Sequence, residues 1–397
     1  MGLRVLFIGY AVSEDAANVL SGASVAGNRM QLGFLRVLAE PTGDFAVDSL
    51  TVLPLAAFPR DRTLWVREGD VDLGGSNVSR RLSFVNLPVL KQIMQVVSGI
   101  RVGGRLMRAH KYDRILAFNM YPQVGIPAWW LGRWFRVPVV SLLADLPIDQ
   151  DPDRQVASKA MMVVHNELTR RLIRTCEGVI VLNQCAAQRY APQAACLLLD
   201  GAIDASLDPP DLEMGVHGPK NIVFTGALVQ YNGILPLIDA MRLVRTQDLV
   251  LDVYGDGQLA TSVRDAASSE PNINYHGKVG SSAMASIQKG AFLLINPRVV
   301  ADPISEVTFP SKVLEYMLSG TPILSTRLNG LRGEYEDKMY FIEGESAQSI
   351  AFAIDDLASR PPSELRDMGA KARRFVLHER SWAARAAAIR DFLAHGV

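Results

Sequence analysis

The chain has 397 residues, of which 49% are hydrophobic and 21% are charged, and its 41 basic and 41 acidic side chains balance to a formal net charge of zero. This length exceeds what one hydrophobic core usually supports, so we expect two domains. The charge balance excludes a global field that would attract nucleic acid, and no segment offers the roughly 20 uncharged apolar residues of a membrane span. Three cysteines without metal-ligand spacing, and a strand that starts at Leu3 with no signal peptide before it, favour a cytoplasmic protein.

Strand and helix patterns alternate through the first half of the chain. The first strand is expected at Arg4–Gly9, followed by a glycine-bearing loop at 21–24 and a helix over Ala26–Leu38. Further strands are predicted at Asp48–Leu53, Asp113–Phe118, Pro138–Leu143, Gly178–Leu182 and Ala195–Leu199. The run at 138–143 is continuously apolar, which is typical of a strand buried on both faces of a parallel sheet. The alternation therefore predicts an α/β, doubly wound sheet.

One region of the first half is locally basic. Between Gly74 and Tyr112 there is no Asp or Glu. Its apolar runs are interrupted by basic residues, namely Arg80, Arg81, Lys91, Arg101, Arg105, Arg108 and Lys111. Basic and apolar residues together indicate a surface for an anionic bilayer, and a core helix with a solvated basic flank is an equally good interpretation.

A turn-rich segment at 201–218 indicates a linker, after which the alternating pattern starts again. The second set of strands is predicted at Asn221–Thr225, Leu249–Tyr254, Ile273–His276, Phe292–Asn296, Pro322–Ser325 and Met339–Ile342. A helix is expected at Leu235–Val244, and an amphipathic helix at Ser381–His395 ends the chain. We therefore predict two Rossmann-like domains, residues 1–203 and 204–377, with residues 378–397 packing back on the first.

The segment Phe309–Pro322 carries the most specific local signals. Pro310 suits the first turn of a helix, Gly320 suits a left-handed C-cap, and Pro322 prevents the helix from continuing. Lys312 and Glu315 share one face near the start of that helix. A helix N-terminus with a lysine is a site for phosphate, and a neighbouring carboxylate suits sugar hydroxyls.

An ordered set of motifs in the second half resembles the C-terminal domain of a retaining GT-B glycosyltransferase of family 4, in the bacterial polysaccharide group. In chain order the set consists of Gly226, the Gly255–Gly257 loop, the His276–Val279 segment, Pro297 and the Phe309–Pro322 motif. The resemblance implies GT-B architecture, with two Rossmann-like domains facing across a cleft. It also implies a nucleotide sugar as donor, and neither a metal nor another cofactor.

The resemblance assigns donor-binding roles in the second domain. Glu315 would hold the ribose hydroxyls. The position of the family's first glutamate is occupied by Val307, and the adjacent Glu306 either replaces it and contacts the donor sugar or is a solvated loop residue. The basic pair that usually binds the diphosphate is absent from residues 226–233, so Lys312 is expected to replace it. The remaining donor-binding residues are expected to be Gly226, Tyr254, Gly255, Gly277, Lys278, Val279, Pro297, Pro310 and Ser311.

Two segments of the first domain are candidates for the acceptor side. The loop Gly22–Ala23–Ser24 would bring backbone N–H groups to the donor phosphate or the acceptor, or it is a plain turn. Asp145 follows the strand that ends at Leu143 and would orient an acceptor hydroxyl, or it is a helix N-cap. The run Asp149–Asp153 has the form of a metal-binding Asp-x-Asp, and we interpret it as an acidic loop without a metal.

The sequence therefore predicts a hexosyltransferase-type enzyme that moves sugar from a nucleotide diphosphate sugar to a hydroxyl acceptor. The basic and apolar region favours a lipid-linked glycan as acceptor, in exopolysaccharide, capsule or O-antigen assembly, with peripheral contact to the inner face of an anionic membrane. Two alternatives stay open: a nucleotide-sugar epimerase of the same fold, and a non-catalytic GT-B subunit that supports a partner.

Overall fold

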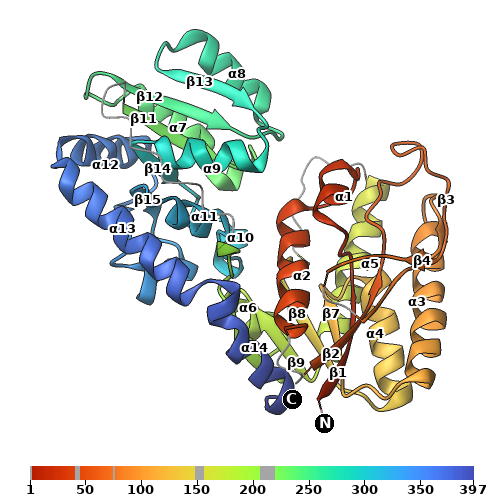
Figure 1. The fold of residues 1–397 in the computed structure, drawn as a ribbon. Coiled ribbons are helices and arrows are strands. Elements are labelled where there is room, and N and C mark those ends of the chain that lie inside the picture. Colours follow the sequence, from red (N-terminus) through yellow and green to blue (C-terminus); the bar gives the residue numbers. More distant parts are fainter. Residues whose placement is uncertain (1, 41–44, 75–76, 148–155, 206–219) are drawn as a thin grey trace. The chain divides into compact units, whose positions relative to one another are not determined.

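The computed structural model describes residues 2–40, 45–74, 77–147, 156–205 and 220–397 (Figure 1). They form two compact units, the first of residues 1–200 and 385–397, the second of residues 201–384. The observed divisions fall a few residues from the predicted ones at 203 and 378. Most of the predicted linker, residues 206–218, lies outside the described residues.

The first unit is built on one mostly parallel sheet. Among the described residues its eight strands follow the order β10-β9-β8-β7-β1-β2-β5-β4. They are β1 (Leu3–Gly9), β2 (Phe45–Thr51), β4 (Gly69–Asp70), β5 (Val78–Arg81), β7 (Arg114–Phe118), β8 (Val139–Leu143), β9 (Gly178–Val181) and β10 (Ala195–Leu198). Only β4 runs antiparallel, against β5. The sequence predicted six of these strands, but it missed β4, β5 and the separate pair β3 (Trp65–Val66) and β6 (Phe84–Val85).

Six helices accompany this sheet among the described residues: α1 (Glu14–Val19), α2 (Val25–Leu38), α3 (Leu90–Ala109), α4 (Pro122–Phe135), α5 (Val156–Ile173) and α6 (Gln184–Tyr190). Every residue of β8 is buried, as expected for a strand covered on both faces. Because β1 lies between β2 and β7, the connections reverse direction there, and this is the point where doubly wound sheets bind ligands.

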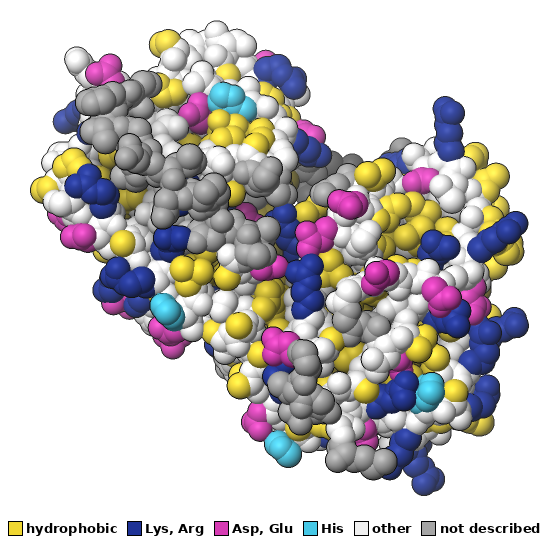
Figure 2. All heavy atoms as spheres, in the orientation of Figure 1, with side chains coloured by type: hydrophobic (Ala, Val, Ile, Leu, Met, Phe, Trp, Pro, Cys, Tyr) yellow, Lys and Arg dark blue, Asp and Glu magenta, His cyan; other side chains and the backbone are white. Residues whose placement is uncertain are grey.

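Helix α3 has two different faces. Its buried face carries Gly99 and Gly103, where an added Cβ would lie 2.8 Å from Pro127 and 2.5 Å from Leu131 of α4, so the two helices pack closely. Its exposed face begins with Leu90, Ile93 and Val97, which are 41%, 56% and 59% exposed. The same face continues with Arg101, Arg105 and Arg108, all exposed. Figure 2 shows Lys and Arg side chains along the edge of the first unit where Figure 1 places α3.

The second unit contains a fully parallel six-stranded sheet among its described residues, in the order β13-β12-β11-β14-β15-β16. The strands are β11 (Lys220–Thr225), β12 (Leu249–Tyr254), β13 (Ile273–Gly277), β14 (Leu293–Asn296), β15 (Ile323–Thr326) and β16 (Tyr340–Ile342), all close to the predicted positions. Its helices are α7 (Ile234–Met241), α8 (Ala260–Ser269), α9 (Ser281–Gly290), α10 (Pro303–Val307), α11 (Lys312–Ser319), α12 (Ala347–Ser359) and α13 (Pro362–Glu379). Here β11 lies between β12 and β14, so the reversal falls at β11.

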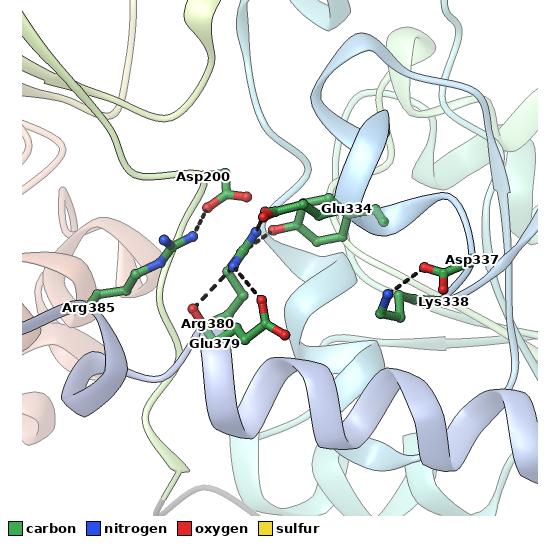
Figure 3. Close-up of polar contacts among 8 residues, drawn as sticks. Asp200, Glu334, Asp337, Lys338, Glu379, Arg380 and Arg385 are labelled. Carbon is green, nitrogen blue, oxygen red and sulfur yellow. Dashed lines mark hydrogen bonds and ion pairs between the residues drawn. The ribbon is translucent and has the colours of Figure 1, made fainter. Parts of the chain in front are cut away.

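The last helix, α14 (Trp382–His395), brings the end of the chain to the first unit. From residue 385 onward the chain belongs to that unit. Arg390 donates hydrogen bonds to the carbonyl oxygen of Val37 and pairs with Glu40, while Arg385 pairs with Asp200 (Figure 3). Arg114 donates to the carbonyl oxygen of Val397. These contacts attach the C-terminal residues to elements near the start of the chain.

Arg380, at the C-cap of α13, is a buried cation within the second unit. Its side chain is 2% exposed and its guanidinium lies 5.3 Å from the ring centre of Tyr335 and 4.6 Å from that of Phe375. It donates to the hydroxyl of Tyr335 at 3.0 Å and pairs with Glu334 and Glu379 (Figure 3). Aromatic rings and carboxylates together offset the cost of burying the charge.

Candidate functional site

The carboxyl ends of β11 and β14 form the reversal point of the second unit, where ligands of such sheets bind. Gly226 follows β11 directly, and Pro297 and Arg298 follow β14. The chain topology thus places two of the predicted donor-binding residues, Gly226 and Pro297, at the same point of the sheet edge.

Glycines let the loops beyond three neighbouring strands approach one another. The N–H of Gly226 donates to Tyr254 O at 3.0 Å, and the N–H of Gly255 donates to Gly277 O at 2.8 Å. The φ of Gly255 is 145°, and a Cβ there would lie 1.8 Å from the carbonyl oxygen of Gly226. Only glycine fits this approach, so the predicted residues Gly226, Gly255 and Gly277 lie in one cluster of loops.

Helix α11 fixes Lys312 against the end of β11. Tyr316, one turn after Lys312, is fully buried, and its hydroxyl accepts from Thr225 N at 3.0 Å and bonds Thr225 Oγ1 at 2.9 Å. Lys312 Nζ donates to Thr225 O at 3.3 Å and lies 4.5 Å from the ring centre of Phe224. The ammonium group is thereby held at the carboxyl end of the central strand.

The ends of α11 agree with the prediction in part. Gly320 is the C-cap with a left-handed φ of 76°, as expected. The helix begins at Lys312, however, and Pro310 precedes it, accepting a hydrogen bond at its carbonyl oxygen from Val313 N. Pro310 therefore forms a tight turn before the helix and does not occupy its first turn.

Arg298 is a second cation at this point, and the sequence analysis missed it. Its side chain is buried, its Nε donates to Ser305 Oγ at 3.0 Å, and its guanidinium donates to Thr308 Oγ1 at 2.6 Å. It also lies 5.0 Å from the ring centre of Tyr231. The sequence predicted Lys312 alone in place of the basic pair, and the structure adds Arg298, two residues after β14, as a second candidate. An arginine two residues after a predicted strand was the available signal.

The charge of Arg298 affects the titration of Lys312. Burial and, to a smaller extent, the neighbouring charge of Arg298 together lower the pKa of Lys312 to about 7. Burial also lowers the pKa of Arg298. Two positive charges held in a poorly solvated position favour an anion as the ligand.

The two glutamates lie on the helices beside these cations. Glu306 is exposed on α10. Val307, which occupies the position of the family's first glutamate, is 2% exposed, so its side chain points into the core. Glu315 is exposed in the first turn of α11. Both carboxylates thus lie on the solvent side of their helices.

The ends of β12 and β13 present a flat aromatic pair. The ring of Tyr254 stacks on that of His276 with centres 4.5 Å apart and an interplanar angle of 11°. His276 Nε2 lies 2.8 Å from Asp252 Oδ1, and Lys278 pairs with Asp256 at 3.4 Å. Burial raises the pKa of the Tyr254 hydroxyl. The predicted residue Tyr254 therefore forms a stacked pair with His276, directly before the predicted residues Gly277, Lys278 and Val279. The sequence did not reveal this stacking.

The first unit has a pocket of about 290 Å³ at its own reversal point. It is lined by Tyr10 after β1 and by Phe118 and Asn119 at the end of β7. The predicted loop Gly22–Ala23–Ser24 and Asp145 also line it, so residues far apart in the sequence share one pocket. Ser24 caps α2 by accepting at Oγ from Gly27 N at 3.2 Å, and this cap orients the loop.

Asp145 is held by Asn119. The Asn119 Nδ2 donates to Asp145 Oδ2 at 3.1 Å, and the Asp145 N–H donates to Asn119 Oδ1 at 3.0 Å. Although the residue as a whole is exposed, desolvation of its carboxyl group within the pocket raises its pKa, and the hydrogen bond from Asn119 opposes that shift. The next described helix, α5, begins at Val156, so Asp145 is not the N-cap of a described helix.

Metal ligands are not grouped in the described parts of either unit. Within residues 2–40, 45–74, 77–147, 156–205 and 220–397, no group of three or more His, Cys, Asp or Glu side chains is placed to hold an ion. The acidic run Asp149–Asp153 lies outside the described residues. Helices long and apolar enough to span a bilayer are likewise absent from the described ranges.

Residues 219–360, which lie almost entirely in the described part of the second unit, match the model of the family described as Glycosyl transferases group 1. The whole chain is similar in structure to a sucrose-phosphate synthase from Thermosynechococcus elongatus, with a TM-score of 0.67, 16% identity, and 98% and 97% of the two chains covered. No curated protein matches the chain by sequence.

Two further structures resemble the chain over its length. The Anabaena protein HepE in complex with UDP-glucose gives a TM-score of 0.64 at 16% identity, with 99% of each chain covered. The lipopolysaccharide outer core galactosyltransferase WaaB in its apo form gives 0.64 at 12% identity, with 100% of each chain covered. These likenesses show that the chain has the GT-B fold.

We expect Gly255→Ala to destabilise the second unit by about 3 kcal/mol or more, because the new Cβ would collide with a backbone carbonyl and the residue would keep a left-handed φ. Gly290→Ala is the matched control, since a Cβ there meets nothing within 4 Å and should change stability by less than about 1 kcal/mol. Denaturant unfolding measures both variants. Equal stability of the two would contradict the close approach of these loops.

Proposed function

We propose that the chain is a retaining glycosyltransferase of family 4 that transfers a hexose from a nucleotide diphosphate sugar to an acceptor hydroxyl. The observation that carries the proposal is the pair Lys312 and Arg298 at the reversal point of a group 1 glycosyltransferase domain. A diphosphate is the ligand that this pair suits best. The structural likeness to HepE with UDP-glucose supports the same class of donor.

The cations would act on the leaving group. Negative charge grows on the nucleotide diphosphate as the glycosidic bond breaks, and prearranged positive charge lowers the energy of that transition state. Lys312 would stabilise this charge, with Arg298 beside it, because the N–H groups of Ser311, Val313 and Leu314 already donate within the turn before α11 and its first residues. Glu315 would hold the ribose hydroxyls, and Glu306 the donor sugar. No metal is needed in this scheme.

The acceptor would bind in the pocket of the first unit. Asp145, fixed by Asn119, would orient the attacking hydroxyl, and the Gly22–Ala23–Ser24 loop would offer backbone N–H groups. With retention of configuration, the leaving phosphate itself can take the acceptor's proton. Arg298 beside Lys312 supports a catalytic role over a non-catalytic subunit, although residues 226–233 carry no basic residue.

The exposed face of α3 supports a lipid-linked glycan as acceptor, in assembly of a bacterial polysaccharide. Leu90, Ile93 and Val97 supply an apolar stripe. The arginines that continue the stripe suit anionic headgroups. We therefore propose peripheral binding to the cytoplasmic face of a membrane.

The donor assignment predicts that one nucleoside diphosphate in a panel of UDP, GDP, ADP, CDP and dTDP stabilises the protein against heat. At a concentration of a hundred times its dissociation constant, the ligand should add about 2.7 kcal/mol to the free energy of unfolding.

Lys312→Gln should weaken nucleotide binding about tenfold or more through loss of a charge-assisted contact, and Glu315→Gln should reduce the preference for ribose over deoxyribose. Both should slow sugar transfer.

The control for these variants is Glu364→Gln, because Glu364 lies in the first turn of α13 as Glu315 lies in the first turn of α11. It should bind and transfer like the wild type. The assignment fails if no nucleotide stabilises the wild type, or if Lys312→Gln transfers sugar at the wild-type rate.

The lowered pKa of Lys312 predicts proton uptake on donor binding. In the free protein the pKa is about 7, below the ordinary lysine value, and a bound diphosphate must raise it. At pH 8 the free lysine is mostly neutral and the bound one charged, so binding should take up close to one proton. At pH 6 the lysine is already charged, and uptake should be small.

Calorimetry in buffers of different ionisation enthalpy measures this uptake. Lys312→Arg is the reference, because arginine stays charged at both pH values and leaves only the ligand's own titration. If wild type and Lys312→Arg took up the same number of protons at pH 8, Lys312 would not be in contact with the diphosphate.

The membrane proposal predicts that the full chain sediments with vesicles that contain phosphatidylglycerol and not with pure phosphatidylcholine vesicles. Ile93→Asp with Val97→Asp should reduce the partition coefficient at least tenfold, because two apolar side chains leave the bilayer. Arg101→Gln with Arg108→Gln should cost about 1 kcal/mol for each charge. Phe352→Asp is the control, since Phe352 is 77% exposed on α12 of the other unit. Equal loss in the control and the α3 variants would refute this surface.

A further inference from the structure

Helix α3 presents two polar side chains, Lys91 and Gln95, to the pocket of the first unit. They lie one helical turn apart, so both are on the same face of the helix. Gln95 is 1% exposed, and its Nε2 has no hydrogen-bond partner among the described residues. A buried donor without a partner costs about 1–3 kcal/mol, so this amide is suited to a ligand that brings an acceptor atom.

Lys91 adds a positive charge to the same wall. The side chain is half-buried, its ammonium group donates to the carbonyl oxygen of Leu55, and it lies 5.6 Å from the ring centre of Phe84. An ammonium group has three donors, and the Leu55 carbonyl uses one of them. Asp61 helps to keep it charged, although burial lowers the pKa of Lys91. Lys91 can therefore still donate to a bound group.

The charges of the lining are asymmetric. Of the described residues that line the pocket, Lys91 carries the only positive charge and Asp145 the only negative one. They come from different elements, α3 and the segment after β8. An acidic group would be repelled by Asp145 and attracted by Lys91, whereas a hydroxyl would suit Asp145. This asymmetry orients an acidic ligand in one way only.

We infer that Lys91 and Gln95 form a subsite for an anionic oxygen group, a carboxylate or a phosphate, carried by the acceptor. The inference rests on the proposed function and adds the chemical class of the acceptor: an acidic sugar or a sugar phosphate, whose attacking hydroxyl lies toward Asp145. At about 290 Å³ the pocket is at the lower end of the range for ligand sites and suits a group near the size of one sugar ring. Two charge-assisted donors on one wall give specificity that a hydroxyl-only ligand would not use.

The test measures binding of three probes to the full chain by calorimetry, with the stabilising nucleoside diphosphate present. Octyl glucuronide carries a carboxylate, octyl glucoside is its neutral counterpart, and the octyl phosphodiester of glucose carries a phosphate. We expect at least one acidic probe to bind tenfold or more tighter than octyl glucoside. The acidic probe that binds tighter identifies the source of the anionic group.

Variants assign the preference to these residues. Lys91→Gln should bring the ratio of acidic to neutral affinity close to one, and Gln95→Leu should lower the ratio several-fold. Lys111→Gln, an exposed lysine that does not line the pocket, should keep the wild-type ratio. Thermal unfolding confirms that each variant is folded.

The inference is overturned if neither acidic probe binds tighter than the neutral one, or if Lys91→Gln weakens all three probes alike. These outcomes are distinct from failure of the proposed function. If the nucleotide still binds, the donor assignment stands and only the acidic acceptor is excluded. If no nucleotide binds in the panel above, the proposed function itself fails.

Discussion

Two positive side chains held close together at the reversal point of the second sheet are the constraint on which this site depends. Lys312 and Arg298 repel each other, and both are poorly solvated, so the unliganded protein bears an electrostatic cost that an anion would relieve. The fold maintains this arrangement with neutral contacts. Tyr316 fastens α11 to Thr225, while Ser305 and Thr308 fasten Arg298 to α10. The buried packing of α11 against the central strands therefore offsets the electrostatic repulsion between Lys312 and Arg298.

The elements that sequence predicted best are those whose signal is local. Buried strands such as Val139–Leu143 and Leu249–Tyr254 are continuous or alternating apolar runs, and Gly320 had the expected left-handed φ because a helix end required it. The two-residue strands β3, β4 and β6 were missed, since so short a segment has no periodicity to detect. The order of strands in the sheet is not written in any local pattern either. That order makes Gly226 and Pro297 neighbours.

Arg298 shows why the site was predicted only in part. The resemblance places a basic pair after β11, whereas Arg298 follows β14, which pairs with β11 in the sheet but lies some 70 residues later in the chain. The stacked rings of Tyr254 and His276 were missed for the same reason, since they lie on adjacent strands. In the first unit, the Gly22–Ser24 loop and Asp145 were identified separately. Their common pocket became visible only when β1 and β7 were seen to be neighbours.

The two cations of the second unit are not interchangeable. Arg298 spends its Nε and part of its guanidinium on Ser305 and Thr308, so it supplies charge in a fixed position and at the same time orients α10, which carries Glu306. Lys312 donates to one carbonyl oxygen at 3.3 Å and lies over the ring of Phe224, and its pKa is about 7, so a bound anion would change its charge. Arg298 thus has a permanent charge that orients α10, and Lys312 has a charge that depends on its surroundings. Exchanging the two residue types would therefore disturb α10 at one position and remove the response to the ligand at the other.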